Sequence, residues 1–389
     1  MSNRERPLRA VFVTYSFAPS AGQSAIIGVL KRFLRLVRYL PPEAVEVHWL
    51  HGGYLPEHDP MVREWLPRLN RYAPSGECLN APGAWLRPRL GRLRWRVGKA
   101  WHPPGRSEKP RLTRLFSKLR PDLVVLMESP LAGFLLEASE VAQELGLPQV
   151  AMDNYMEPGH PDELIRGSPQ IERWFLLGLP YRGERGWQGE RILLAPPLLA
   201  PSPGPASERA DVTILGYDPK VGEDGVTLAG LLPAGTVARL LGPPLPEEVR
   251  ERYRRQAGGA RLLFAPMPDE ADYRASLEGS SLVVCKNGFQ QIVECLAVGT
   301  PVIVSEGSGV PGCFLSEEIL RFTRYLPPDQ GLWDDAVGLA RGWMSERPAM
   351  PWTSALAGIP DMARHSAGLF LEFLERSAAE PLTARGRTA

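Results

Sequence analysis

The segment CKNGFQQIVECLAVGTPVIVSEGSG, residues 285–309, places a short helical pattern between two apolar runs. The run SLVVC, 281–285, predicts a buried strand, and PVIVS, 301–305, predicts the next one. A helix is expected between them, over about 289–297. A strand–helix–strand unit of this kind is typical of a parallel β-sheet whose faces are covered by helices.

The polar residues of this segment lie where such a unit can bind a ligand. Gly288 leaves the backbone open at the start of the helix, where free N–H groups and the positive end of the helix dipole favour an anion. Glu294, further along the helix, can accept two hydrogen bonds from a vicinal diol such as that of ribose. Gly307, Gly309 and Gly312 allow the following loop to approach a ligand closely. These parts fit a nucleotide diphosphate-sugar; the alternative is a solvated glutamate with glycines that only form turns.

The alternation of strand and helix continues through the whole chain. Its 389 residues predict two domains, and a content of 44% hydrophobic and 23% charged residues is that of a soluble globular protein. The strands are expected at 8–18, 45–52, 121–129, 148–154, 211–218, 236–243, 260–266, 281–285 and 301–305, and the main helices at 25–40, 131–146, 246–257 and 362–379.

The predicted fold class is α/β, with two Rossmann-like domains that face each other across a cleft. The stretch at 194–211, rich in Pro, Ser and Ala, is the best linker candidate. We expect an N-terminal domain at 1–198, a linker at 199–210, a C-terminal domain at 211–375 and a tail at 376–389, with the last helix able to pack back on the N-terminal domain. Ligands of open parallel sheets bind beyond the carboxyl ends of the strands, so the cleft is the expected site.

Composition excludes several other classes of protein. A formal net charge of +1 says nothing about nucleic acid, and no nucleic-acid-binding motif accompanies the basic residues, so a nucleic-acid partner is not expected. No apolar run is long enough to cross a membrane, and the apolar run near the N-terminus is too short for a signal peptide. The cysteines form no CxxC pair and no zinc-ligand spacing occurs, so reduced buried thiols in a cytoplasmic protein are expected at Cys78, Cys285, Cys295 and Cys313.

The stretch EGSSLVVCKNGFQQIVECLAVGTPVIV resembles the donor-binding segment of GT-B glycosyltransferases. It is most similar to the lipid-intermediate N-acetylglucosaminyltransferases of peptidoglycan synthesis and to their diacylglycerol-glycosyltransferase relatives. In that group a strand ends in a polar residue, a small polar residue and Gly, followed six residues later by Glu and then by a small-Gly-x-Pro turn. The resemblance covers about 260–306, and the matching residues are Lys286, Asn287, Gly288, Glu294, Gly299 and Pro301.

The resemblance implies a donor site in the second domain and an acceptor site in the first. Glu294 would bind the ribose, and backbone groups near Met267 would meet the base. The donor-binding residues that we expect are Met267, Lys286, Asn287, Gly288, Gln291, Glu294, Gly307 and Ser308. The nucleotide sugar would be a substrate, so neither a cofactor nor a metal is expected.

The N-terminal half resembles the family less closely. PSAGQSAIIG stands where the family has a Gly-rich loop, and MDNYMEPG, with Asn154, stands where it has a polar motif. The catalytic His of the family is replaced by Gln23, which cannot act as a general base. The first loop of the second domain, LGYDPKVGEDG, and the donor-sugar loop, SEGSGVPGCF, also depart from the family pattern.

An inverting transfer still needs a base for the acceptor hydroxyl. Candidates at the strand ends of the first domain are Asp153, ranked first, then His160 and Glu157, with Glu128 at the end of another strand. Each of them has a structural interpretation as well. Because no Asp-x-Asp motif occurs, a metal-dependent diphosphate site is not expected, and Lys286 with helix N-termini would neutralise the leaving group.

A basic aromatic segment at 85–120 holds twelve Arg or Lys residues and one acid, Glu108. Leucines, Val97 and Trp101 recur there at helical spacing, which is typical of an interfacial helix on anionic lipid. The equal alternative is an Arg-rich helix packed on the core. The helix at 25–40 adds basic residues that a lipid-linked acceptor would also explain: Lys31, Arg32, Arg35 and Arg38.

Together these features predict a glycosyltransferase that moves a sugar from a nucleotide-diphosphate donor, expected to be UDP-linked, to a lipid-linked or cell-surface glycan acceptor. The transfer is expected to be inverting and metal-independent, at the cytoplasmic side of a membrane. The alternatives are a nucleotide-sugar epimerase or hydrolase of the same fold and a catalytically inactive binding protein. Lys286 to Glu294 would serve all three.

Overall fold

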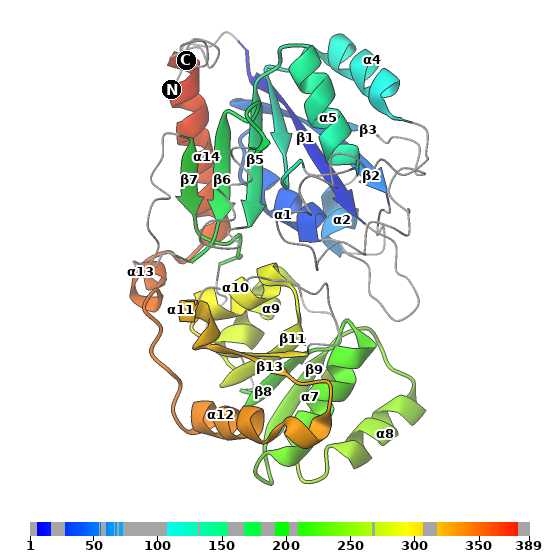
Figure 1. Ribbon diagram of the computed structural model, residues 1–389, viewed down its shortest axis with the longest axis vertical. Coiled ribbons are helices and arrows are strands. Elements are labelled where there is room, and N and C mark those ends of the chain that lie inside the picture. The colour runs from blue at the N-terminus through cyan, green and yellow to red at the C-terminus, as the bar shows by residue number, and fades with distance from the viewer. Residues whose placement is uncertain are drawn as a thin grey trace.

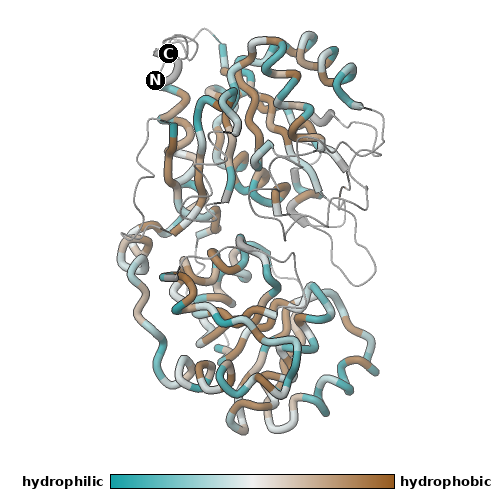
Figure 2. Tube along the Cα trace, viewed as in Figure 1, coloured by the Kyte–Doolittle hydropathy of each residue, from teal (hydrophilic) through white to brown (hydrophobic). Residues whose placement is uncertain are grey.

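The computed structural model describes residues 6–16, 28–53, 55, 60–65, 67, 70–72, 107–130, 133–154, 167–179, 191–201, 209–266, 269–305 and 317–379. Figure 1 shows two lobes, each built on a twisted sheet with helices around it. Hydrophobic residues gather on the strands of both lobes, as Figure 2 shows. The predicted α/β class with two Rossmann-like domains is confirmed.

The N-terminal domain holds a seven-stranded sheet in the order β3-β2-β1-β4-β5-β6-β7, and all of its strand pairs are parallel. Val, Leu and Phe side chains fill both faces of the central strands, as expected where helices cover both faces. The strands are β1 (Leu8–Ser16), β2 (Val45–Gly53), β3 (Asn70–Tyr72), β4 (Leu123–Leu126), β5 (Gln149–Asn154), β6 (Arg173–Leu177) and β7 (Ile192–Ala195). Its described helices are α1 (Gly28–Val37), α2 (Pro60–Trp65), α4 (Lys109–Leu119) and α5 (Gly133–Glu144).

The C-terminal domain holds a six-stranded parallel sheet in the order β10-β9-β8-β11-β12-β13. Its strands are β8 (Val212–Leu215), β9 (Val237–Leu241), β10 (Arg261–Ala265), β11 (Leu282–Lys286), β12 (Val302–Ser305) and β13 (Thr323–Leu326). Its helices are α7 (Pro219–Leu231), α8 (Glu247–Gln256), α9 (Glu270–Glu278), α10 (Phe289–Ala297), α11 (Glu317–Leu320), η5 (Gln330–Leu332) and α12 (Asp334–Ser345). After α12 the chain continues through α13 (Thr353–Ala357) into α14 (Met362–Ala379).

The two sheets share one connectivity. In each, the first strand lies in the interior, the next two extend to one side, and the fourth begins the other side. The strand order therefore reverses between β1 and β4 in the first domain and between β8 and β11 in the second. In open parallel sheets, ligands bind beyond the carboxyl ends of the strands at such reversal points.

The strand–helix–strand unit predicted for residues 281–305 is confirmed. β11, α10 and β12 follow each other in it, and β11 pairs with β12 in parallel. Ile292, Cys295 and Leu296 of α10 are fully buried against the sheet. Cys285 and Cys295 are buried free thiols, as predicted, while the other two cysteines lie outside the described residues.

The last helix, α14, joins the N-terminal domain. Phe370 of α14 packs on Phe12 of β1 and Phe175 of β6, with ring centroids 6.1 and 5.2 Å apart. In Figure 1 this helix, drawn in red, lies beside the upper sheet, and the orange segment before it passes from the lower lobe to the upper one. The chain thus crosses between the domains twice.

The linker candidate at 194–211 overlaps strand β7 at its start and is packed against the protein after it. Ile192–Ala195 is strand β7, and Leu198 and Leu199 are buried. The backbone of Leu199 accepts a hydrogen bond from the N–H of Ala363, and that of Ala200 accepts one from the guanidinium of Arg274. Prolines and leucines together favour a packed extended segment here, because their apolar side chains are covered by α14 and α9.

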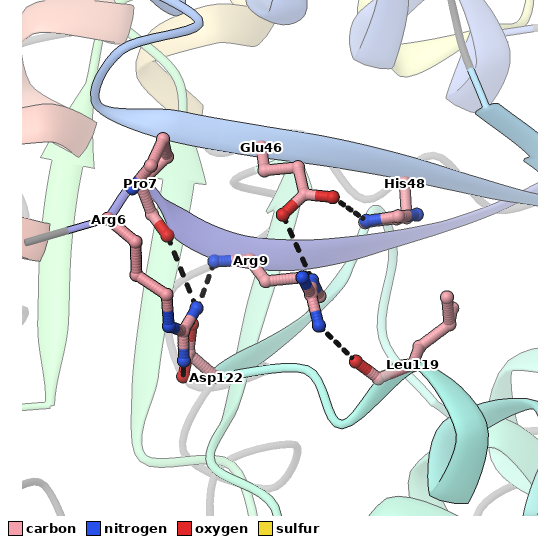
Figure 3. Close-up of polar contacts among 7 residues, drawn as sticks. All are labelled: Arg6, Pro7, Arg9, Glu46, His48, Leu119 and Asp122. Carbon is pink, nitrogen blue, oxygen red and sulfur yellow. Dashed lines mark hydrogen bonds and ion pairs between the residues drawn. The ribbon is translucent and has the colours of Figure 1, made fainter.

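A polar network joins the amino ends of strands in the N-terminal sheet, opposite the strand carboxyl ends (Figure 3). Arg6 donates two hydrogen bonds to Asp122, at 2.8 and 2.9 Å, and the N–H of Arg9 donates a third at 2.8 Å. The Arg9 side chain donates to Glu46 and to the carbonyl of Leu119. These bonds join β1, β2 and the start of β4, so this edge serves stability.

The basic segment is described only in its last part. There α4 packs through Leu112, Phe116 and Leu119, which agrees with the interpretation as a helix on the core for this portion. Residues 85–106 lie outside the described residues, so their membrane contact stays a prediction. No helix in the described part of the chain is long and apolar enough to span a bilayer.

Candidate functional site

Glu128 and Tyr15 meet at the reversal point of the N-terminal sheet. Tyr15 is the last residue but one of β1, and Glu128 is the second residue after β4. The Tyr15 hydroxyl donates a short hydrogen bond to Glu128 Oε2. Burial raises the pKa of Glu128 to about 7, and the nearby Asp153 carboxylate raises it too, while Arg32 and the Tyr15 bond lower it. A carboxyl with this pKa can accept or give a proton at neutral pH.

Asp153, at the end of β5, is buried and fixed by its neighbours. Its Oδ2 atom accepts hydrogen bonds from the Ser129 backbone N–H, at 2.9 Å, and from the Ser129 hydroxyl. Its Oδ1 atom lies 3.7 Å from Nη1 of Arg32. Asp153 therefore holds the turn that carries Glu128, and its carboxylate is surrounded by donors.

Arg32 joins these strand ends from α1. Its Nη1 atom donates to the carbonyls of Met127 and Met152, at 2.8 and 3.0 Å, at the ends of β4 and β5. Arg32 and Arg35 are 2% and 5% exposed. The prediction that these two arginines belong to a lipid-facing basic surface is therefore wrong, because both guanidinium groups are turned into the protein.

The reversal point of the C-terminal sheet is formed by the starts of two helices that differ in charge. At α7, Asp218 caps the helix by accepting a hydrogen bond from the Lys220 N–H at 2.9 Å. The buried Asp224 lies in the same region, bonded by Lys220 Nζ and the Ser305 hydroxyl at 2.7 and 2.5 Å. At α10, Gly288 provides no side-chain cap. Only the start of α10 therefore offers uncapped N–H groups to an anion.

The predicted diphosphate residues gather at this start. Lys286 ends β11, and Asn287 is buried, with its Oδ1 atom accepting a 3.3 Å bond from Tyr325. A Cβ atom at Gly288 would lie 3.6 Å from the Lys286 side chain and 3.8 Å from Oε1 of Gln291. That Oε1 atom is buried and has no hydrogen-bond partner among the described residues. Lys286, Asn287, Gly288 and Gln291 thus lie together at the start of α10, and their role in donor binding stays a prediction.

Glu294 is buried and its carboxylate is engaged by three donors. Tyr273 of α9 donates to Oε2 at 3.0 Å, and Gln290 donates to Oε1 at 2.9 Å. Arg35, from α1 of the other domain, donates a short bond to Oε1 as well. The predicted ribose-binding carboxylate therefore lies at the boundary between the domains, bonded to a residue of the N-terminal one.

The two halves of the site meet around a small cavity. It is lined by Arg32, Leu177, Pro197, Leu198, Gln290, Val293 and Glu294. Gln290 also lies against the first residue of α1, because a Cβ atom at Gly28 would be 3.0 Å from its Oε1 atom. Arg32 thus contacts both the cavity that holds Glu294 and the strand ends that hold Glu128 and Asp153.

Several predicted site residues lie outside the described residues: Gln23, Glu157, His160, Met267, Gly307 and Ser308. Their roles stay predictions. The sequence reasoning missed three residues that complete the site, namely Arg35, Glu270 and Tyr273. A signal for Arg35 exists, because Arg32 and Arg35 fall among the apolar residues of a helix and charged residues are rarely buried without a partner.

Comparison with known proteins places the fold. No family model and no curated protein sequence matches the chain. Its structure is similar to that of MurG from Acinetobacter baumannii, with a TM-score of 0.55 and 12% identity over 95% of this chain and 100% of the other. It is also similar to a UDP-glucosyltransferase from Polygonum tinctorium, with a TM-score of 0.57 and 14% identity over 95% and 99%.

A third similar structure is a putative UDP-N-acetylglucosamine 2-epimerase from Listeria monocytogenes, with a TM-score of 0.54 and 12% identity over 96% and 97% of the two chains. The chain has the GT-B fold, in which two Rossmann-like domains face each other. At these identities the likeness establishes the fold alone. The activity has to be argued from the site.

Proposed function

We propose that the protein is a glycosyltransferase that moves a sugar from a nucleotide-diphosphate donor to an acceptor hydroxyl. The observation that carries the proposal is the pairing of two sites across the domain boundary. On one side Lys286, the uncapped start of α10 and Glu294 form a place for a diphosphate and a ribose. On the other side Glu128, with a pKa of about 7, stands at the reversal point of the other sheet.

The donor half would work without a metal. The sequence has no Asp-x-Asp motif, and Lys286 with the free N–H groups of α10 supplies positive charge for the leaving diphosphate. The carboxylates at the start of α7 would repel an anion, which favours α10. A UDP-linked donor is favoured, because structures of the same fold include a UDP-glucosyltransferase and a putative UDP-N-acetylglucosamine 2-epimerase.

The acceptor half would supply the general base. Glu128 would take the proton of the acceptor hydroxyl as its oxygen attacks the anomeric carbon, while the bond from that carbon to the diphosphate oxygen breaks. Attack from the face opposite the leaving group inverts the anomeric centre. The acceptor is proposed to be a lipid-linked or cell-surface glycan precursor at the cytoplasmic side of a membrane, with 85–106 as the segment that would contact lipid.

An epimerase is the second candidate, because one of the similar structures is a putative 2-epimerase and its likeness covers nearly the whole chain. A carboxyl with a pKa of about 7 can also take a proton from carbon-bound hydrogen. The products separate the two candidates. An epimerase changes the free nucleotide sugar without any acceptor, whereas a transferase releases nucleoside diphosphate in proportion to glycosylated acceptor.

Substitution of Gly288 tests the donor half. Gly288→Asp places a carboxylate at the start of α10, as Asp218 does at α7, and should weaken UDP-sugar binding at least about tenfold by capping the N–H groups and repelling the diphosphate. Gly288→Ala is the matched control. Its Cβ meets only ordinary contacts and the backbone φ of −134° suits any residue, so it should bind within about twofold of the parent chain.

The measurement is titration calorimetry, or thermal shift, with UDP-glucose, UDP-N-acetylglucosamine, dTDP-glucose and GDP-mannose. Binding of at least one of them by the parent chain, kept in the alanine variant and lost in the aspartate variant, supports the proposal. Equal binding of the nucleotide sugar by the two variants would show that the diphosphate does not bind at the start of α10. Binding of none of the four by the parent chain or the alanine variant would refute the donor half.

A further inference from the structure

Arg35 connects the two domains through a forked ion pair. From α1 of the N-terminal domain, its Nη1 atom donates to Glu294 of α10, while Nε and Nη2 donate to Glu270 of α9 at 2.5 and 3.2 Å. We call this set of three side chains the Arg35 fork. Arg35 is 235 positions from Glu270 and 259 from Glu294, so the fork exists only when the domains are closed together.

The fork is largely buried, and its guanidinium is always charged. The Arg35 and Glu294 side chains are 5% and 3% exposed, and that of Glu270 is 16% exposed. Burial lowers the pKa of Arg35, but the carboxylates of Glu270 and Glu294 outweigh it and raise the pKa above its ordinary value. Such a buried pair gives little net stability in comparison with apolar packing, although removal of one partner is costly. Stability alone is thus a weak reason for its presence.

The fork and a ribose need the same carboxylate. Tyr273, Gln290 and Arg35 already donate to the two oxygens of Glu294. A ribose diol bound in the proposed way would donate two further hydrogen bonds to this carboxylate, whose side chain is only 3% exposed while Arg35 is bonded to it. Since that guanidinium reaches Glu294 from the opposite domain, donor and closed fork compete.

We propose that the Arg35 fork is an interdomain latch that keeps the donor site shut, and that nucleoside diphosphates bind by displacing Arg35 from Glu294. This inference rests on the proposed function. The geometry suits an exchange, because Arg35 keeps its two bonds to Glu270 when the bond to Glu294 is given up. Glu270, which is less buried, keeps the released guanidinium bound. The ribose hydroxyls then replace Arg35 as donors to Glu294.

A latch predicts that removal of a cation improves the binding of an anion. If the site is open in about a tenth of molecules or less, opening it permanently tightens the apparent Kd at least about tenfold. Arg35→Met combined with Glu270→Met removes one positive and one negative charge together, and is expected to bind UDP at least about tenfold more tightly than the parent chain. The 2′,3′-dideoxy analogue of UDP cannot donate to Glu294, so its Kd should change less than about twofold.

Arg38→Met is the matched control. Arg38 directly follows α1, three residues beyond Arg35, and pairs with Glu64 of α2 inside the N-terminal domain, at 3.3 Å. Its loss removes the same charge from the end of the same segment and should leave both Kd values unchanged. Arg35→Lys is the second variant should the double variant not fold. Lysine keeps the charge but cannot form the fork, so a tightening of UDP binding between those of the parent chain and the double variant is expected.

The outcomes separate the latch from the proposed function. Equal or weaker UDP binding by both Arg35 variants, with parent-chain binding still abolished by Gly288→Asp, overturns the latch and leaves the donor site in place. Equal tightening for UDP and its dideoxy analogue also overturns it, because competition at the ribose would then be absent. Failure of every variant to bind either nucleotide refutes the donor site and the latch with it.

Discussion

Replacement of Asp153 with alanine is expected to lower the free energy of unfolding by about 3–5 kcal/mol. The carboxylate accepts two hydrogen bonds from Ser129 and lies 3.7 Å from the buried guanidinium of Arg32. Its removal takes away a counter-charge of that cation and leaves the Ser129 N–H without this acceptor, which are costly changes inside a protein. Urea denaturation followed by circular dichroism measures the loss.

Asp122→Ala supplies the comparison. Asp122 also accepts bonds from a backbone N–H and an arginine, but at the exposed edge of the same sheet, where water replaces lost partners (Figure 3). Its loss should cost only about 1 kcal/mol. The sequence reasoning ranks Asp153 as the first candidate for the general base. An Asp153→Ala protein that keeps its stability and loses transfer would restore that ranking and contradict the structural role.

The contrast between these residues shows what a sequence reveals about a site. Hydrophobic periodicity predicts β11, α10 and β12 because each element follows from neighbouring residues, and the same local pattern puts Lys286 and Gly288 at a helix start. Strand ends are equally local, which is why Asp153 and Glu128 are both recognised as candidates. Their difference is not local, since it depends on Ser129, Arg32 and Tyr15 meeting them in the fold.

The Arg35 fork is harder to predict from the sequence than the strand-end residues. Arg35 and Glu294 lie 259 positions apart, and their contact depends on how the two domains are oriented. The same arginine gives a plausible lipid-facing pattern when the helix is considered alone. Its burial becomes visible only when α9 and α10 are placed over α1, so orientation of the domains, rather than any motif, decides its role.

Glu128→Gln is expected to lower the rate of transfer by about 10²–10⁴-fold while nucleotide-sugar affinity stays within about twofold. Glutamine keeps the shape and can still accept the Tyr15 hydrogen bond, but it cannot take a proton. In the parent chain the rate should fall on the acid side of about pH 7, where Glu128 becomes protonated. Release of nucleoside diphosphate, coupled to acceptor glycosylation, measures the rate.

Glu172→Gln is the matched control. Glu172 is a partly buried carboxyl whose pKa is also raised by burial, but it stands before β6, at the edge of the sheet opposite the strand carboxyl ends. Its loss should leave the rate and its acid limb unchanged. Asp153→Asn removes a charge that raises the pKa of Glu128, so the acid limb should move to lower pH in that variant. An unmoved limb would assign it to another group.

Stability gives Glu128 a second, independent signature. The folded chain holds the Glu128 proton up to about pH 7, whereas the unfolded chain releases it near 4.5, so the stabilising effect of the protonated form is complete below pH 4.5 and is lost as the pH rises through 7. Glutamine never ionises. Glu128→Gln should therefore be more stable than the parent chain at pH 8, by about 1–3 kcal/mol, and should lose this advantage at pH 5. Replacement of a residue that only supports the fold would destabilise the protein at both pH values. A gain in stability at pH 8 together with loss of transfer therefore identifies Glu128 as a base held in place at the expense of stability.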